Sequence, residues 1–218
     1  LIVKYNGSTN APVNAGTYTV TAEVVDTNSY YSAPTSGAWV VAKATPSITA
    51  APTASAITYG QTLADSTLSG GSGSVAGSFA FTSSSDTPTG AGSYSAGVTF
   101  TPTDTANYNT ASTTVSVTVN KASQTITFPA VSGGMVGGTV TLTAISSSGL
   151  TVSYASSDTS KATISGNTLN FVGVGSVTIT ASQAGNGNYL AATDATRSVT
   201  IVSATTPAQD YLSGFGLS

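Results

Sequence analysis

The chain has 218 residues and a net charge of −3, and 6% of its residues are charged, against roughly 25% in an average soluble domain. It contains no histidine and no cysteine, which excludes the usual proton shuttle at neutral pH, a thiol nucleophile and nearly every transition-metal ligand set. The net negative charge gives no sign of the positively charged surface that binds nucleic acid. No apolar run approaches the ~18 residues that span a bilayer. We therefore expect no catalytic residue, no metal site and no cofactor.

The N-terminal stretch opens LIVKYNG, without an initiator Met or a signal peptide, and we read the chain as a piece of a longer protein. After Gly16, the sequence TYTVTAEV alternates hydroxyl and apolar residues. Successive side chains of a strand point to opposite faces, so this pattern predicts a strand with one apolar face and one hydroxyl-lined face. Thr and Ser on the solvent face keep a high strand propensity without adding charge.

The middle of the chain repeats this pattern. SYSAGVTF after Gly92 and VSVTV at residues 115–119 both alternate. GGSGS, from Gly70 to Ser74, has neither a lysine nor a following helix, which excludes a phosphate loop and indicates a flexible hairpin loop.

The C-terminal part predicts seven strands, separated by turns. Ser165-Gly166-Asn167 is a tight-turn signal, and Ser-Gly-Gly at 132–134 is likewise expected to be a turn. The strands are expected near residues 124–128, 139–144, 151–155, 161–165, 168–171, 175–182 and 196–202.

Three similar copies of about 80 residues follow one another, the first lacking its N-terminal half. DTNSYYSA, DTANYNTA and GNGNYLAA precede the last strand of each copy, and Lys-Ala ends the first two. The expected divisions are a truncated module (1–45), a complete module (46–122), a further complete module (123–202) and a linker or truncated segment (203–218). Gly and Pro punctuate the chain every 8 to 12 residues or so, as in an all-β sandwich. We predict tandem immunoglobulin-like β-sandwich modules, with no helices of note.

The second copy, from ITYGQTLADSTLSGG to GSFAFTSSSDTPTGAGSYSAGVTFTPTDTANYNTASTTVSVTVNKA, resembles the MBG-type repeat of bacterial immunoglobulin-like domains. The first copy resembles it through KYNG, NAGTYTVTA and its Lys-Ala ending. The third, with SGLTVSYASSDTSKATISGNTLNFVGVGSVTITASQAGNGNY, resembles the related Big-type group. The tail PAQDYLSGFGLS resembles the lead-in to calcium-loop segments, but the chain stops before any such loop.

The resemblance implies modules of large secreted or surface-attached bacterial proteins, where such arrays serve as stalks and in adhesion. It carries no catalytic site that could be transferred to this chain. The implied location is extracellular or the bacterial cell surface. The implied partners are neighbouring modules of the same chain and surface glycans or host-cell proteins, with neither nucleic acid nor membrane insertion.

Tyr30, Tyr108 and Tyr189 precede the last strand of each copy and are the main candidate site residues. They could offer an aromatic contact to a glycan or a protein. Recurrence at a fixed place favours a structural corner instead, with the hydroxyl bonded to nearby backbone.

Asp26, Asp104 and Asn186 lie a few residues before these tyrosines. An Asx side chain that bonds its own backbone favours a turn. A calcium site is the alternative, but calcium takes six or more oxygens and each loop offers one acid at most.

Trp39 and Tyr31 are the remaining candidate ligand contacts, although core or seam packing is the favoured role of Trp39. Lys43 and Lys121 lie at module ends, where solvated linker lysines are expected rather than buried isopeptide crosslinks. The sequence thus favours a non-catalytic structural and interaction array, a stalk or spacer with possible adhesion. The alternative is a carbohydrate-binding accessory module of a polysaccharide-processing enzyme, which would need a coplanar row of exposed aromatic rings.

Overall fold

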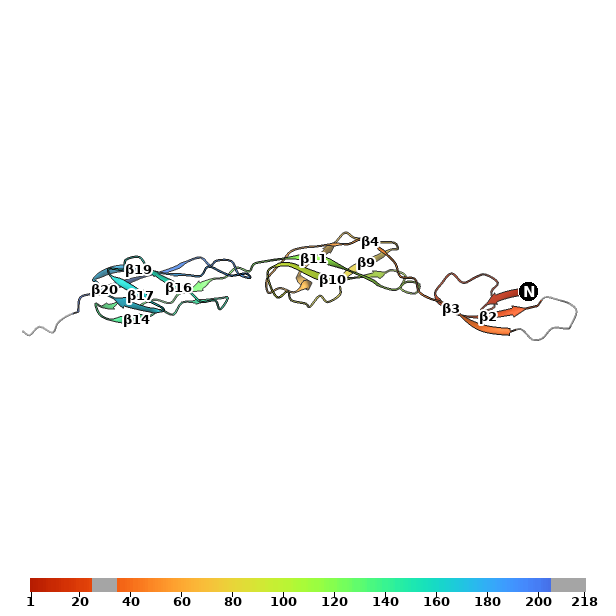
Figure 1. Ribbon diagram of the computed structural model, residues 1–218, viewed down its shortest axis with the longest axis horizontal. Helices are drawn as coiled ribbons and strands as arrows, with labels where there is room; N and C mark the ends of the chain where they lie inside the picture. Colours follow the sequence, from red (N-terminus) through yellow and green to blue (C-terminus); the bar gives the residue numbers. More distant parts are fainter. Residues whose placement is uncertain (25–34, 205–218) are drawn as a thin grey trace, which may run out of the picture. The chain divides into compact units, whose positions relative to one another are not determined.

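The computed structural model describes residues 1–24 and 35–204 (Figure 1). Contacts divide the chain into two compact units, Leu1–Asn120 and Lys121–Ser218, so that copies one and two share the first unit. Among the described residues the only helical element is the short 3-10 turn η1 (Leu63–Asp65). The all-β prediction is therefore confirmed.

The first copy is a single antiparallel sheet in the order β1-β2-β3. Gly16 pairs with Val41 and Tyr18 with Trp39 across the last two strands. The strands are β1 (Ile2–Tyr5), β2 (Gly16–Glu23) and β3 (Thr35–Val41).

The second copy has a four-stranded sheet in the order β6-β11-β10-β9, with β6 parallel to β11. A two-stranded ribbon lies across it, formed by β4 with β8 and by β5 with β7. Apolar residues of both layers form the core, with Leu63 of η1 in it. The strands are β4 (Ile48–Ala50), β5 (Thr53–Ala54), β6 (Ile57–Thr58), β7 (Leu68–Ser69), β8 (Ser72–Gly73), β9 (Gly77–Phe81), β10 (Gly92–Pro102) and β11 (Ala111–Asn120).

The third copy has two full sheets around its core. One sheet has the order β13-β20-β19-β16 and the other β14-β18-β17, with β12 paired to β15. With β16, β19 and β20 as strands C, F and G, and with β14, β18 and β17 as strands B, E and D, these are the strand orders of an immunoglobulin sandwich. The Ig-like prediction is therefore confirmed. The strands are β12 (Ile126–Thr127), β13 (Gly134–Met135), β14 (Thr139–Thr141), β15 (Ile145–Ser146), β16 (Ser153–Ser156), β17 (Ala162–Ser165), β18 (Thr168–Phe171), β19 (Gly175–Ser182) and β20 (Ala195–Val202).

Each copy has its own sheet with the strand order C-F-G. These strands are β1, β2 and β3 in the first copy, β9, β10 and β11 in the second, and β16, β19 and β20 in the third. The strand equivalent to F starts with a glycine that faces the end of strand G, as Gly92 faces Val119 and Gly175 faces Ile201. The φ angles of Gly92 and Gly175 are +130° and +134°, values that side-chain-bearing residues rarely adopt. This geometry explains why a glycine opens the strand in each copy.

The expected turn at residues 132–134 is wrong at its C-terminal end. Gly134 begins β13, which runs parallel to β20. A Cβ atom at Gly133 would lie 2.1 Å from the carbonyl oxygen of Thr200. Gly133 therefore allows the two backbones to approach each other, while Gly134 makes room for the Phe171 ring, which would lie 2.6 Å from its Cβ.

The expected flexible hairpin at Gly70 to Ser74 is also wrong. Ser72 and Gly73 form β8, which pairs with β4. A Cβ at Gly73 would lie 2.6 Å from the Phe100 ring, and one at Gly71 would lie 2.8 Å from the Phe79 ring. These glycines serve close packing of the ribbon on two aromatic rings.

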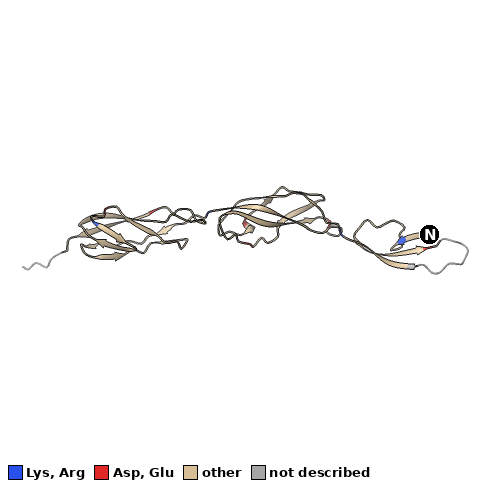
Figure 2. Ribbon diagram, viewed as in Figure 1, with Lys and Arg blue, Asp and Glu red and all other residues tan. Residues whose placement is uncertain are grey.

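The predicted hydroxyl-lined faces are present as cross-strand pairs, each with an oxygen–oxygen distance within hydrogen-bonding range. Ser93 and Ser116 lie 2.8 Å apart, and Ser176 and Ser198 lie 3.1 Å apart. The ribbon in Figure 2, coloured by residue type, shows that charged residues are sparse along the strands. Hydroxyl pairs thus take the place that ion pairs occupy on most solvent-facing sheets.

Candidate functional site

The second-copy corner, residues 104–109, is the loop between strands β10 and β11. The carboxylate of Asp104 accepts hydrogen bonds from the backbone N–H of Asn107 (3.2 Å) and from its side-chain amide (2.7 Å). The backbone N–H of Tyr108 donates to the Asp104 carbonyl at 3.1 Å. The side-chain bond from Asn107 is the main cause that lowers the pKa of Asp104 below its usual value, aided by backbone N–H groups and by Lys43.

The third-copy corner, residues 186–190, forms a similar turn without an aspartate. The side-chain oxygen of Asn186 accepts the backbone N–H groups of Asn188 (2.8 Å) and Tyr189 (2.9 Å). Asp104 and Asn186 therefore both form the Asx turns expected of them, while Asp26 lies outside the described residues. Because an amide takes the place of the carboxylate in the third copy, this turn does not require an acid.

Both described corners bind a Lys-Ala segment from the end of the preceding copy. Ala44 donates its N–H to the carbonyl of Asn107 at 2.9 Å and accepts the N–H of Asn109 at 2.8 Å. These bonds place Ala44 beside Tyr108 as an isolated parallel bridge. The Lys-Ala segment thus pairs with the corner through a single bridge.

The third-copy corner repeats this arrangement within its own unit. Ala122 donates to the carbonyl of Asn188 at 2.9 Å and accepts the N–H of Leu190 at 2.9 Å. It forms a parallel bridge with Tyr189. Ala122 thus makes the same two backbone bonds as Ala44.

The lysine of each segment also contacts the corner. The ammonium of Lys43 donates to the carbonyl of Thr105, and that of Lys121 to the carbonyl of Asn186, both at 2.7 Å. Both lysines are solvent-exposed, as expected, but each ammonium has a defined backbone acceptor. Hydrogen bonds that involve a charged group are the stronger ones, so the lysines favour docking of the segment.

Asn107 extends the second-copy corner to the loop between β1 and β2. Its side-chain oxygen accepts the N–H of Ala15 at 2.7 Å, and its amide nitrogen donates to the Asn14 side chain at 3.2 Å. This contact could not be read from the sequence, because the partners lie 92 and 93 residues apart.

The predicted site residues fall in different surroundings. Tyr108 and Tyr189 are half-buried in their corners, while Tyr30 and Tyr31 lie outside the described residues. Trp39 is 45% exposed, and its ring lies 5.2 Å from that of Tyr5 at an interplanar angle of 44°. The corner tyrosines are thus brought together with the Lys-Ala segments, whereas Trp39 stands apart from them.

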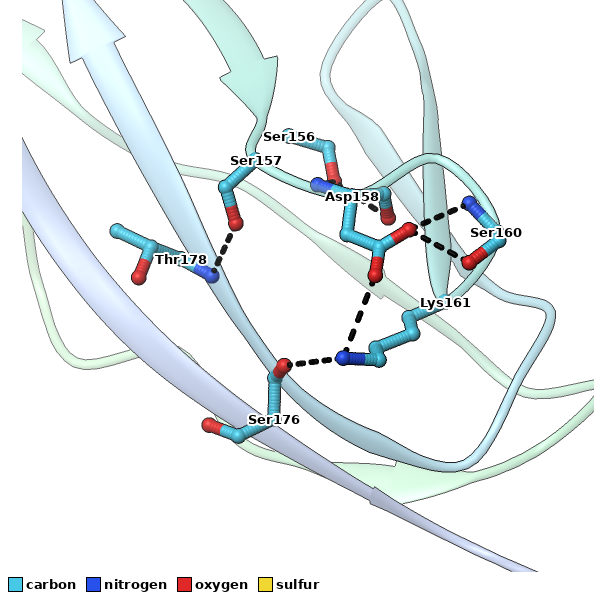
Figure 3. A network of polar contacts seen from close by, with 7 residues as sticks. All are labelled: Ser156, Ser157, Asp158, Ser160, Lys161, Ser176 and Thr178. Carbon is cyan, nitrogen blue, oxygen red and sulfur yellow. Dashed lines mark hydrogen bonds and ion pairs between the residues drawn. The ribbon is translucent and has the colours of Figure 1, made fainter.

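A second polar cluster surrounds Asp158 in the third copy (Figure 3). Its carboxylate accepts the hydroxyl of Ser160 at 2.6 Å and lies 3.3 Å from the ammonium of Lys161. These two groups, Ser160 first, lower the pKa of Asp158. Lys161 also donates to the carbonyl of Ser176 at 3.4 Å, so the cluster ties the turn before β17 to β19.

The arrangement offers little acid–base chemistry. Asp104 and Asp158 have lowered pKa values and are ionised at neutral pH, so neither is a proton donor there. Across residues 1–24 and 35–204, no three acidic side chains gather as metal ligands would. The same ranges contain no helix that could cross a membrane. What the corners do bind is a backbone segment.

Comparison with known proteins gives one family match. Residues 1–45 match the family model of the MBG domain. Among curated proteins none matches this chain.

Similar solved structures include Drosophila N-cadherin EC1-4 (14% identity, 87% of this chain, TM-score 0.42). Others are Drosophila OTK extracellular domains 3-5 (14% identity, 88% of this chain and 72% of that one, TM-score 0.35) and the I-band fragment I67-I69 of titin (13% identity, 87% of this chain and 75% of that one, TM-score 0.36). The chain spans 58% of the length of the N-cadherin fragment.

Proposed function

We propose that this chain is a non-catalytic array of immunoglobulin-like modules in a secreted or surface-attached bacterial protein. It acts as a stalk or spacer that positions other parts of that protein, and it contributes to adhesion. The module divisions follow the repeats, at residues 45 and 122 and near 202. The MBG match at residues 1–45 supports this assignment for the first copy.

The repeated docking of Lys-Ala on a corner is the observation that carries the proposal. Ala44 and Ala122 make the same two backbone hydrogen bonds to their corners. Backbone pairing between the end of one repeat and the corner of the next suits a spacer, because it attaches each Lys-Ala segment to the following repeat through main-chain hydrogen bonds. Each repeat then contacts mainly its neighbours, as in other repeat proteins.

The scarcity of side chains suited to acid–base catalysis supports the same assignment. Both carboxylates with shifted pKa values lie in turns, bonded to neighbours in sequence. General acid–base catalysis needs a positioned group whose pKa lies near the working pH. Neither carboxylate meets this condition.

Small-angle scattering of the chain 1–218 tests the proposal. A compact globule of this length has a radius of gyration of about 17 Å, and an unfolded chain one of about 50 Å. A spacer predicts a value well above the first and well below the second, unchanged between low and physiological salt because few charges are present. A radius near the compact value would contradict the proposal.

A further inference from the structure

The end of the third copy repeats the docking alanine of the first two copies. In the first copy, Val41 pairs with the glycine that opens β2, and Ala44 follows three residues later. In the third copy, Ile201 pairs with the glycine that opens β19, and Ala204 follows three residues later. Ala204 therefore occupies the position of the alanine that binds a corner in each of the other copies.

Ala204 does not make the hydrogen bonds that its equivalents make. The N–H of Ala44 donates to the carbonyl of Asn107 at 2.9 Å, and its carbonyl accepts the N–H of Asn109 at 2.8 Å. Among residues 1–24 and 35–204, no group bonds the N–H or the carbonyl of Ala204, which is exposed. Both backbone groups are therefore available to the two partners that a corner provides.

A second backbone group at this end of the third copy has no partner either. In the first copy, the residue before the opening glycine is Ala15, whose N–H donates to the side-chain oxygen of Asn107 at 2.7 Å. Its equivalent in the third copy is Val174, and no acceptor for the N–H of Val174 lies in the described part of the chain. Two places that a corner contacts on the first copy thus recur on the third.

Exposed apolar side chains lie beside these backbone groups. Met135, Val202 and Val174 are 50%, 50% and 58% exposed. They lie on adjacent chain segments, because the strand order is β13-β20-β19, Met135 pairs with Val202, and Val174 directly precedes β19. The corresponding pair in the second copy is polar, Thr58 with Asn120. Exposed apolar residues that gather in one place favour contact with another protein surface.

We propose that the end of the third copy is a docking site for the corner of a further immunoglobulin-like module of the array. The N–H and the carbonyl of Ala204 pair with the corner backbone, and the N–H of Val174 donates to the side-chain oxygen of an asparagine or aspartate in the corner. The contact covers the three exposed apolar side chains. This inference rests on the proposed function and extends it by naming the part of the partner that is bound.

The third copy differs from the others at the residue before the docking alanine. Ser203 stands where Lys43 and Lys121 each donate to a corner carbonyl at 2.7 Å. Hydrogen bonds that involve a charged group are the stronger ones. Replacing Ser203 with lysine should therefore strengthen docking of the third copy.

Two extended chains test the site. Each contains residues 1–204, followed by residues 45–122 in one chain and by residues 123–202 in the other, so that Ala204 takes the place of Ala44 or Ala122. We expect the amide of Ala204 to exchange with solvent more than about tenfold more slowly than an unstructured amide in these chains. The amide of Val174 should be protected likewise in the chain that carries residues 45–122. Unprotected exchange of Ala204 in both extended chains would overturn the proposal.

The chain 1–218 distinguishes the other possible occupants. We expect its Ala204 amide to exchange freely at every protein concentration. Protection that does not depend on concentration would assign the site to residues 205–218, and protection that increases with concentration would assign it to a second copy of the chain. Either result would overturn the proposal. Scattering by the chain 1–218 does not depend on docking at Ala204, so this inference and the proposed function can fail separately.

Ser203→Lys and Thr200→Lys form a matched pair in the extended chains. Both place one positive charge near the end of β20, but only a lysine at position 203 has the place of Lys43 beside the corner. Ser203→Lys should raise the protection factor of Ala204 by roughly threefold to tenfold, and Thr200→Lys should leave it unchanged. Equal effects would show that charge alone is responsible and would contradict the site.

A second pair tests the apolar contact. Val202→Thr should lower the protection factor of Ala204 by roughly threefold, because less apolar surface is covered on docking. Val40 is 64% exposed on β3 of the first copy, and Val40→Thr should have no effect. Equal protection of Ala204 in these two variants would contradict the contact.

Discussion

Asn107 makes the largest set of side-chain contacts in the second-copy corner. It bonds Asp104 within the corner and Asn14 and the backbone of Ala15 in the first copy. Asn107→Ala should therefore lower the free energy of unfolding of the first copy by about 1–2 kcal/mol, the cost of losing a few hydrogen bonds. Trp39, the sole tryptophan, lies in the first copy, so its fluorescence in a urea titration follows the unfolding of this copy.

Asn109→Ala is the matched control for this measurement. The amide of Asn109 contacts the Lys43 carbonyl and the Thr45 hydroxyl at 3.4 and 3.3 Å, long distances for hydrogen bonds. Its loss should cost about 0.5 kcal/mol or less. An equal loss in both variants would show that Asn107 has no special role.

The ionisation of Asp104 gives a second test at this scale. Its pKa in the folded chain lies below the ordinary value of 3.8, mainly because Asn107 bonds the charged form. A lowered folded-state pKa means that the carboxylate stabilises the fold above the unfolded pKa and that this contribution is lost as the pH falls through the folded pKa. Carboxyl-carbon NMR should therefore place the Asp104 midpoint below 3.8, and Asn107→Ala should move it upward. A midpoint that Asn107→Ala leaves in place would contradict this cause.

At the scale of elements, the glycines of the ribbon control how closely β8 approaches the sheet. A Cβ at Gly73 would lie 2.6 Å from Phe100, whereas one at Gly97 would lie 3.4 Å from the Thr82 hydroxyl. Gly73→Ala should destabilise the second copy by about 1–3 kcal/mol through overpacking, as measured by thermal unfolding. Gly97→Ala should be neutral or slightly stabilising because it restricts the unfolded chain. A neutral Gly73→Ala would mean that the ribbon is not held against Phe100.

Local pattern predicted the strands whose residues alternate strictly. Residues 168–171 and 175–182 were expected as strands and appear as β18 and β19 with the same bounds. Parallel strand β13 was not predicted, because Gly133 and Gly134, which allow close approach to the Thr200 backbone and to the Phe171 ring, resemble turn residues in sequence. Residues 70–74 were expected to form a flexible loop for a similar reason, because glycines that allow close packing on a ring look like turn glycines in sequence.

The corners were found from the repeat of their tyrosines and Asx residues, and the two described Asx turns follow from local chemistry. Their docked partners could not be read from the sequence. Lys43 and Thr105, for example, lie 62 residues apart. Only the folded register brings such groups together, and no local spacing encodes it.

At the scale of the whole molecule, hydroxyl pairs and backbone pairing replace the ion pairs of most soluble proteins. The described residues contain two ion pairs, Lys4 with Glu23 and Lys161 with Asp158. Exposed pairs of this kind contribute roughly 0–1 kcal/mol and are screened by salt. We therefore expect the thermal unfolding midpoint at pH 7 to change by no more than a few degrees between low and 1 M sodium chloride, as measured by circular dichroism. A drop of about 10 °C or more would contradict this prediction.

Docking of a Lys-Ala segment on each corner is the central claim, and amide hydrogen exchange tests it most directly. Four N–H groups form the docking bonds: Ala44, Asn109, Ala122 and Leu190. If the segments are docked in solution, these amides exchange more than about tenfold more slowly than unstructured amides, since an opening free energy of about 1.4 kcal/mol already gives this factor. Exchange of all four at the unprotected rate, with the strands β10, β11, β19 and β20 still protected, would contradict the claim.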